Sequence, residues 1–239
     1  MAVGYIASEN MTVARGLTRG AYAVNKFGYN SSVGTDFETV WDGNNVYTYI
    51  ASAGTATAAS SDSGDNTGTV NVEGLDANFN LVSETITIGG SAGSQSFYRI
   101  FRASLLTHPS GPTNIGNITI TADSKSAAII TAGKGQTLMA LYTIPAGKKG
   151  YLHQLDVGSS KDLENEIQFL IRGNVIGNVF RTIEFLTTRG GFVEKTFTFP
   201  VEIPEKHDIE VRASTSSTSK ISAGFELLVL DDPRVSGMR

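Results

Sequence analysis

Apolar and polar residues alternate through the second half of the chain, and this period of two limits the fold more than any other feature. Residues 166–172 place Ile167, Phe169 and Ile171 on one side, and the charged or amide residues Glu166, Gln168 and Arg172 lie on the other. Successive side chains of a strand point to opposite faces, so this segment predicts a strand with one buried face. Further segments with the composition of strands are 137–144, 151–157, 180–186, 192–203, 208–213 and 223–230.

Strands of this length, separated by short turns, are typical of a sandwich of two antiparallel sheets. The sequence therefore predicts an all-β fold: an antiparallel β-sandwich whose C-terminal half is jelly-roll-like, with a smaller β-rich N-terminal half. One strand pair of that half is expected at 37–41 and 45–51, joined by the turn Asp42-Gly43-Asn44. The predicted division is an extended N-terminal arm (1–35), a β-rich domain (36–125) and a sandwich domain (126–239).

Composition excludes several classes of protein. The chain of 239 residues has a net charge of −4, which argues against direct nucleic-acid binding, because such binding depends on Lys and Arg at phosphates. It contains no Cys, which excludes disulfides, a thiol nucleophile and Cys-ligated metals. The sequence has no apolar run long enough to span a bilayer and no signal-peptide pattern at its start. We therefore expect a soluble protein made in the cytoplasm, without membrane contact.

The first 35 residues are locally basic and aromatic. Over Ser8–Asn25, apolar residues recur at helical spacing, but Gly16 and Gly20 interrupt the pattern, and each costs about 1 kcal/mol relative to Ala. We interpret the segment as an extended or partly helical docking arm; the alternative is a first strand followed by a loop. The candidate docking residues are Arg15, Arg19, Tyr22, Lys26, Phe27 and Tyr29.

The stretch Ser52–Gly68 consists almost entirely of small residues, so it predicts either a flexible loop or a weak edge strand with a loop. Asp62, Asp65 and Asn66 offer oxygen ligands for Ca²⁺ there, but their spacing departs from the twelve-residue calcium loop. We therefore predict no metal site and no cofactor.

Motifs for catalysis are also unconvincing. Residues 89–93 match the G-x-S-x-G pattern around Ser91, but a predicted strand follows instead of a helix, which favours a hairpin turn. His108, His153 and His207 lie far apart and form no zinc motif. The glutamates 184, 194, 202 and 210 occupy outward strand positions, as does Asp208, where charged side chains are normally solvated. The sequence therefore predicts a protein that is not an enzyme.

Three segments resemble a known family: 74–88, 135–148 and 204–213. They are similar to virion structural proteins of tailed, marine-type bacteriophages, a family without assigned catalytic or binding residues, and the similarity extends over about 36–231. The resemblance implies a multi-copy component of the virion, assembled in the host cytoplasm. Its expected role is a capsid decoration (cement) protein, or else a neck, tail or baseplate component.

The expected partners are other copies of the chain, as a dimer or trimer, and the major capsid protein or other virion proteins. Sandwiches offer sheet edges and flat faces for such contacts, and homo-oligomers usually close with cyclic symmetry. A glycan-binding adhesin remains the alternative from another class, and it would need a row of exposed aromatic residues.

Overall fold

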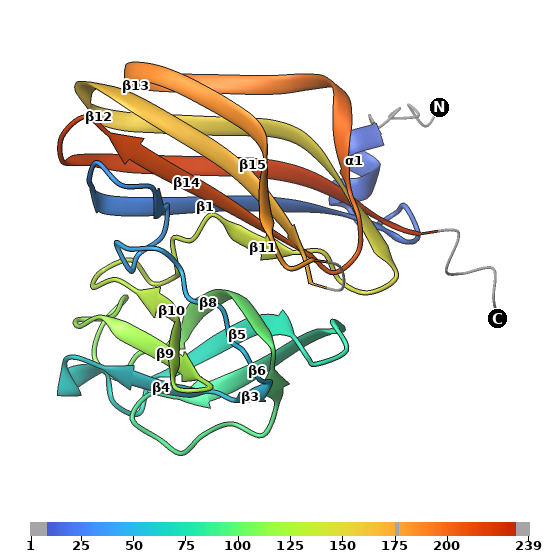
Figure 1. The fold of residues 1–239 in the computed structure, drawn as a ribbon. Helices are drawn as coiled ribbons and strands as arrows, with labels where there is room; N and C mark the ends of the chain where they lie inside the picture. The colour runs from blue at the N-terminus through green and yellow to red at the C-terminus, as the bar shows by residue number, and fades with distance from the viewer. Residues whose placement is uncertain (1–8, 175–176, 233–239) are drawn as a thin grey trace, which may run out of the picture.

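The computed structural model describes residues 9–174 and 177–232, which form two β-sheet bodies packed against each other (Figure 1). The larger body is a sandwich of six strands: β1 (Ala21–Val33), β11 (Leu141–Thr143), β12 (Lys148–Gly173), β13 (Phe180–Ile203), β14 (His207–Thr215) and β15 (Ser219–Asp231). The smaller body is formed by the chain between β1 and β11.

Two sheets make up the sandwich, and both contain β12 and β13. The first half of β12, up to Ser159, pairs with β15 and with the second half of β13, and β15 pairs with β1. The second half, from Glu164, pairs with the first half of β13, and β14 lies between β12 and β11. Eight antiparallel strand segments in two sheets form a jelly-roll arrangement. The predicted all-β sandwich is confirmed.

The long strands β12 and β13 cross from one sheet to the other at a bulge. Ser159 pairs with Gly191 and Glu164 pairs with Arg189, so residues 160–163 lie opposite Gly190 alone. Extra residues on one strand bend a strand pair sharply. Gly190 has a φ of +68°, and a Cβ there would lie 3.0 Å from the Cα of Asp162. The four strands predicted at 151–157, 166–172, 180–186 and 192–203 are therefore the halves of two bent strands.

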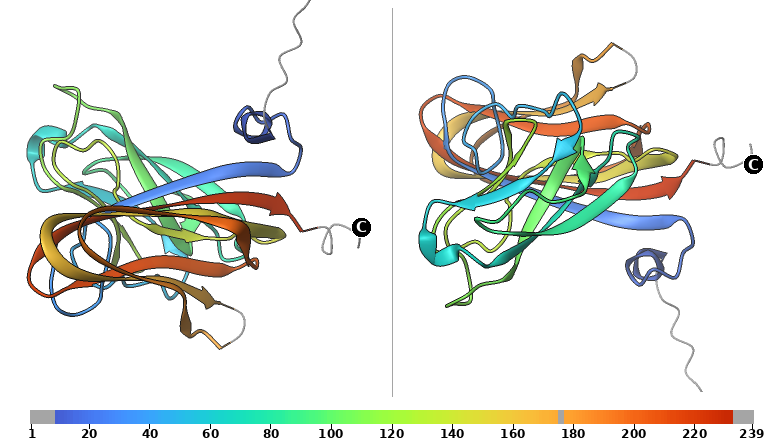
Figure 2. Two further views of the ribbon diagram at one scale, coloured as in Figure 1. Left: turned by 90° about the horizontal axis from the view of Figure 1, so that it is seen from above. Right: turned by 90° about the horizontal axis from the view of Figure 1, so that it is seen from below.

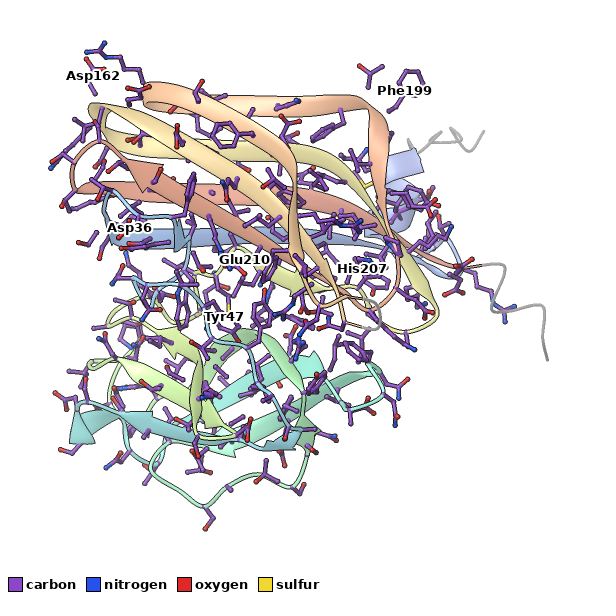
Figure 3. All side chains as sticks on the ribbon, viewed as in Figure 1. Asp36, Tyr47, Asp162, Phe199, His207 and Glu210 are labelled. Atoms are coloured by element: carbon purple, nitrogen blue, oxygen red, sulfur yellow. The ribbon has the colours of Figure 1, made fainter. Side chains whose placement is uncertain are left out.

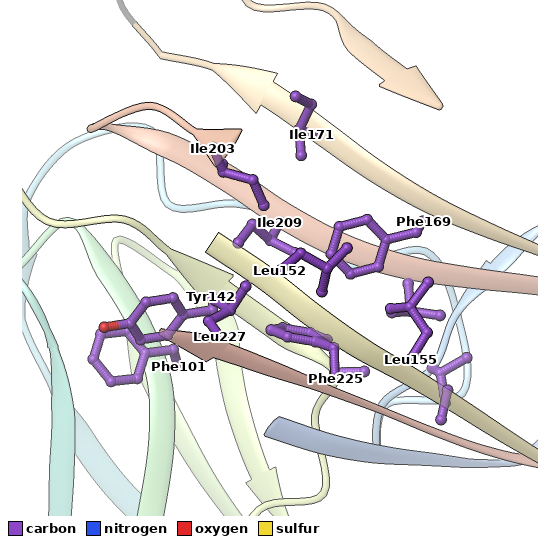
Figure 4. Packing of buried hydrophobic residues seen from close by; sticks show 14 of the residues in the cluster. Phe101, Tyr142, Leu152, Leu155, Phe169, Ile171, Ile203, Ile209, Phe225 and Leu227 are labelled. Atoms are coloured by element: carbon purple, nitrogen blue, oxygen red, sulfur yellow. The ribbon is translucent and has the colours of Figure 1, made fainter. Parts of the chain in front are cut away.

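Aromatic and aliphatic side chains from both sheets fill the sandwich (Figure 4). Ile167, Phe169 and Ile171 are buried, as their alternation predicts. The rings of Phe169 on β12 and Phe225 on β15 meet edge to face with centroids 5.4 Å apart. The residues whose alternation predicted a strand with one buried face are therefore residues that pack between the two sheets.

The smaller body is an insertion between β1 and β11 (Figure 2). After β2 (Glu38–Thr39), which pairs with β14, its strands are β3 (Gly54–Thr55), β4 (Thr57–Ser60), β5 (Thr69–Leu75), β6 (Leu81–Thr87), β7 (Ser96–Phe97), β8 (Arg99–Thr107), β9 (Ile118–Ala122) and β10 (Lys125–Ile130). β5 lies between β6 and β8, and β9 lies between β4 and β10. A second apolar core, including Val72, Phe97 and Ile120, packs inside it.

The chain division predicted from the sequence differs from this arrangement. Residues 21–33 of the predicted arm form β1, which pairs with β15 along most of its length, and residues 125–130 pair with β9 in the insertion. The helical pattern yields only α1 (Glu9–Ala14), because the chain turns at Gly16 and Gly20, where φ is +68° and +73°. Polar Lys26 and Asn30 occupy buried positions of β1, which conceals its period of two.

The predicted hairpin at 37–51 is wrong. Only Glu38–Thr39 forms a strand there, and residues 45–51 run beside the sandwich as an irregular segment. Trp41 turns back on this segment, with its ring against Gly43 and its Nε1 donating to the carbonyl of Asn45 at 2.9 Å. The stretch 52–68 contains β3, β4 and the short 3₁₀ helix η1 (Ser63–Asp65), which matches the expected weak strand with a loop.

Candidate functional site

The six predicted docking residues do not form one surface. Arg15 and Arg19 are exposed between α1 and β1, whereas the other four lie on β1 itself: Tyr22, Lys26, Phe27 and Tyr29. Their side chains alternate, so Lys26 is buried while Phe27 is exposed. A free arm over residues 21–33 is therefore incompatible with the structure, because this segment is an integral strand of the sandwich.

Two buried carboxylates join the insertion to the sandwich, and their position corrects the prediction that they face water. Asp208 and Glu210 lie on the outer face of β14, but the insertion covers that face and both are 0% exposed. Glu210 lies between the sandwich and the insertion (Figure 3). Asp208 accepts hydrogen bonds from Arg99 of the insertion (Nε to Oδ1, 2.9 Å) and from Arg172 of β12 (Nε to Oδ2, 3.1 Å). Glu210 accepts from Tyr49 at 3.1 Å.

Aromatic rings enclose these arginines. The guanidinium carbon of Arg172 lies 4.0 Å from the ring centroid of Tyr49 and 4.7 Å from that of Phe180. The guanidinium of Arg99 lies 4.2 Å from the Tyr98 ring. Cations stacked on aromatic faces are stabilised further when they are desolvated. We call this set of residues (Tyr49, Tyr98, Arg99, Arg172, Phe180, Asp208 and Glu210) the interdomain cluster.

The Asp208 carboxylate of the interdomain cluster stays ionised although it is buried. Burial raises the pKa of Asp208, but attraction to Arg99 and Arg172 outweighs it, so the pKa lies below its ordinary value. Burial, together with the nearby Glu210 carboxylate, holds the pKa of Tyr49 well above its ordinary value. The cluster therefore contains ionic pairs and a neutral phenol, which suits a fixed joint between the two bodies rather than proton transfer.

The sequence analysis missed this joint because alternation in a strand cannot show what covers its polar face. The one available signal was Arg99, which interrupts the apolar run from Phe97 to Phe101. An arginine is almost never fully buried unless it is paired, so its place in that run indicated a buried carboxylate partner. Nothing in the sequence pointed to Asp208 as that partner.

A cleft of about 590 Å³ separates β1 from the insertion. Its walls include Tyr22, Phe27, Leu81 and Arg102, and Lys26 lies at its base, where the ammonium donates to the carbonyl of Phe101. Burial, together with repulsion by Arg102, lowers the pKa of Lys26 to about 7, although attraction to Glu73 partly opposes the shift. The cleft has the size of a small-molecule site, but Lys26 is occupied with the insertion backbone.

Asp65, one of the considered calcium ligands, has an internal role instead. Its carboxylate is buried and accepts from the backbone N–H groups of Ile115 (2.7 Å) and Gly116 (2.9 Å) and from the ring of His108 (2.8 Å). Burial raises its pKa, but these donors together with Ser60 bring it down to about 2. Asp65 thus fixes the loop after β8 to η1.

The other residues weighed for chemistry lie apart. Ser91 is exposed in the loop between β6 and β7, with a strand after it as expected, whereas Glu184 and Glu194 lie on β13 of the sandwich. His207 bonds the carbonyl of its neighbour Glu205 at 2.9 Å. Within residues 9–174 and 177–232, no group of three His, Asp or Glu side chains is placed to hold a metal ion. The described helices include none that is long and apolar enough to cross a membrane.

Three exposed phenylalanines lie along β13. Phe192 and Phe199 are 66% and 86% exposed, and Phe185 is also exposed. Phe199 projects from the outer end of the sandwich (Figure 3). Large apolar residues grouped on one element often mark a contact with another protein, whereas scattered ones are ordinary. β13 is therefore the candidate interaction surface of this fold.

Comparisons with known proteins found similarity at the level of solved structures alone. No protein-family model matches the sequence, and no curated protein sequence matches it. A structure of infectious bursal disease virus is 13% identical, with 89% of this chain and 73% of that chain covered and a TM-score of 0.25. Empty particles of cowpea mosaic virus are 10% identical, covering 78% and 84%, with a TM-score of 0.23.

A ribosomal oxygenase from Escherichia coli is also similar, at 8% identity, with 74% of this chain and 43% of that chain covered and a TM-score of 0.18. Viral particle proteins and an enzyme are thus both similar to this chain, and all of these TM-scores are low. A β-sandwich hosts many functions, so the function has to be argued from this chain's own surfaces.

Proposed function

We propose that this chain is a non-enzymatic structural protein of a tailed-phage virion, and that it acts as a capsid decoration (cement) protein. It would stabilise the head as a homo-oligomer docked on the major capsid protein. The proposal rests on the sequence segments that resemble virion proteins and on one structural observation. The buried charges join the two bodies of the chain, while three exposed phenylalanines, Phe185, Phe192 and Phe199, lie on β13.

That observation favours an adhesive role for a physical reason. A catalytic site needs ionisable groups that converge on a cleft and keep free hydrogen-bonding capacity. Here Asp208 pairs with Arg99 and Arg172, and Arg99 also donates to the carbonyl of Ile50. Glu210 accepts from Tyr49 and Arg212, and Lys26 contacts the carbonyl of Phe101. Rigidly joined bodies with an apolar surface suit a component that binds neighbours over a large area.

The test is the copy number of the protein in purified particles, measured by quantitative mass spectrometry against the major capsid protein. A decoration protein is expected in hundreds of copies, and particles that lack it should lose their DNA at lower temperature. A count of roughly six or twelve, typical of rings with cyclic symmetry, would instead assign it to the neck, tail or baseplate. Absence from particles would refute the virion role, and saturable binding to host polysaccharide would then support an adhesin.

A further inference from the structure

The outer edge of β13 is unusually long. The strand has 24 residues and, within the described chain, pairs with β12 alone, so it forms the free edge of both sheets of the sandwich. A free edge presents unpaired N–H and C=O groups, and proteins normally protect such edges with short strands, charges, proline or bulges. β1, at the opposite side of the sandwich, is shorter, and its Tyr29 N–H donates to the carbonyl of Leu138.

The largest bulge on β13 itself lies near one end of the strand. Leu152 pairs with Val201 and Gln154 pairs with Thr196, so residues 197–200 form a bulge opposite His153. This bulge contains Pro200 and carries the most exposed phenylalanine, Phe199. The stretches 180–189 and 191–196 also pair with β12, with one further register shift at Ile183, and within the described residues their outer edge has no strand partner. The edge of β13 is thus open for pairing with another strand, and the exposed Phe199 side chain lies near one end of it.

The charge of β13 indicates what can bind there. The strand carries three basic residues (Arg181, Arg189 and Lys195) and three acidic ones (Glu184, Glu194 and Glu202), so its net charge is zero in a chain of −4. Two copies of an acidic protein repel each other over most of their surfaces, but they do not along this strand. A second copy also supplies an edge of the same length, and an antiparallel pair of identical strands has the two-fold symmetry of the commonest homo-oligomers.

We propose that β13 is the interface with a second copy of this chain, formed by antiparallel pairing of the two β13 edges and burial of Phe192 and Phe199. This inference rests on the proposed function, because it identifies the surface through which the copies of the proposed homo-oligomer contact each other. The interface joins two sandwiches edge to edge and leaves the insertion of each copy free for other virion proteins.

Oligomeric mass in solution tests the proposal, measured by light scattering during size-exclusion chromatography over a concentration series. The chain of 25.4 kDa should elute as a dimer. Phe192→Ser and Phe199→Ser should each raise the dissociation constant about tenfold or more. Leu106→Ser is the matched control, because Leu106 is 55% exposed on β8 of the insertion, and it should leave the mass unchanged. Since all three side chains are exposed, the variants should fold like the parent.

Cysteine cross-linking gives a second readout, because the chain contains no Cys of its own. Phe192→Cys should form a disulfide-linked dimer under mild oxidation, whereas Leu106→Cys should not. A monomeric wild-type chain, or an oligomer that both serine variants leave intact, would overturn the proposal. Neither result bears on whether the protein is present in virions, which the copy number decides separately.

Discussion

Replacing Lys26 with Met should change the pH dependence of stability in a way that no exposed lysine can reproduce. The Lys26 ammonium is buried at 3% exposure between β1 and the insertion, and its pKa falls to about 7. In the unfolded chain the pKa returns to about 10.5. Below pH 7 folding must therefore bury a charge, and this penalty disappears as the pH rises from 7 towards 10.5.

The magnitude follows from the size of the shift. Each pKa unit corresponds to about 1.4 kcal/mol, so the wild type should gain about 4 kcal/mol of unfolding free energy relative to Lys26→Met between pH 6 and pH 10. The methionine also leaves the carbonyl of Phe101 without its donor, which costs about 1–3 kcal/mol at every pH. The variant should thus be more stable than wild type at pH 6 and less stable at pH 10.

Urea unfolding at a series of pH values measures this difference. Trp41 is the single tryptophan and is buried at 3% exposure, so its fluorescence reports unfolding directly. Lys220→Met serves as the control because Lys220 is exposed, and its stability should track the wild type at every pH. If the difference between wild type and Lys26→Met is the same at pH 6 and pH 10, the burial of a charged amine at the interface is refuted.

Three further substitutions test the packing and the buried charges. Asp208→Asn leaves Arg99 and Arg172 without a buried counter-charge and should lower the unfolding free energy in urea by about 3–5 kcal/mol; a loss below 1 kcal/mol would contradict the role of the interdomain cluster. Phe169→Ala should lower the unfolding free energy by about 3–5 kcal/mol in the same assay. This loss should not depend on pH, in contrast to the loss caused by Asp208→Asn. The pKa of Asp65 in the folded chain is about 2, so the wild type should lose stability relative to Asp65→Asn as the pH falls from 4 to 2 in acid unfolding. If the two stability curves are parallel over this range, the stabilising role of the ionised Asp65 carboxylate is refuted.

The sequence by itself determined where most strand segments of the sandwich lie after residue 140, although it missed β1. Ile167, Phe169 and Ile171 are buried as their alternation predicts, because a strand has two faces and one of them must leave water. The strand after Ser91 also follows from local preferences. These features depend on residues close together in the chain, so the sequence carries enough information to predict them.

The tertiary structure alone decided which strands belong together and what covers them. β1 pairs with β15 although nearly the whole chain separates the two strands in sequence. The buried Lys26 and Asn30 of β1 are tolerated because the segment between β1 and β11 supplies their hydrogen-bond partners. Asp208 follows the same alternation as a solvated residue, yet it is buried, because Arg99 arrives from a segment more than a hundred residues away. A local pattern fixes which side of a strand is polar, but only the packed fold determines whether water or another part of the chain lies against it.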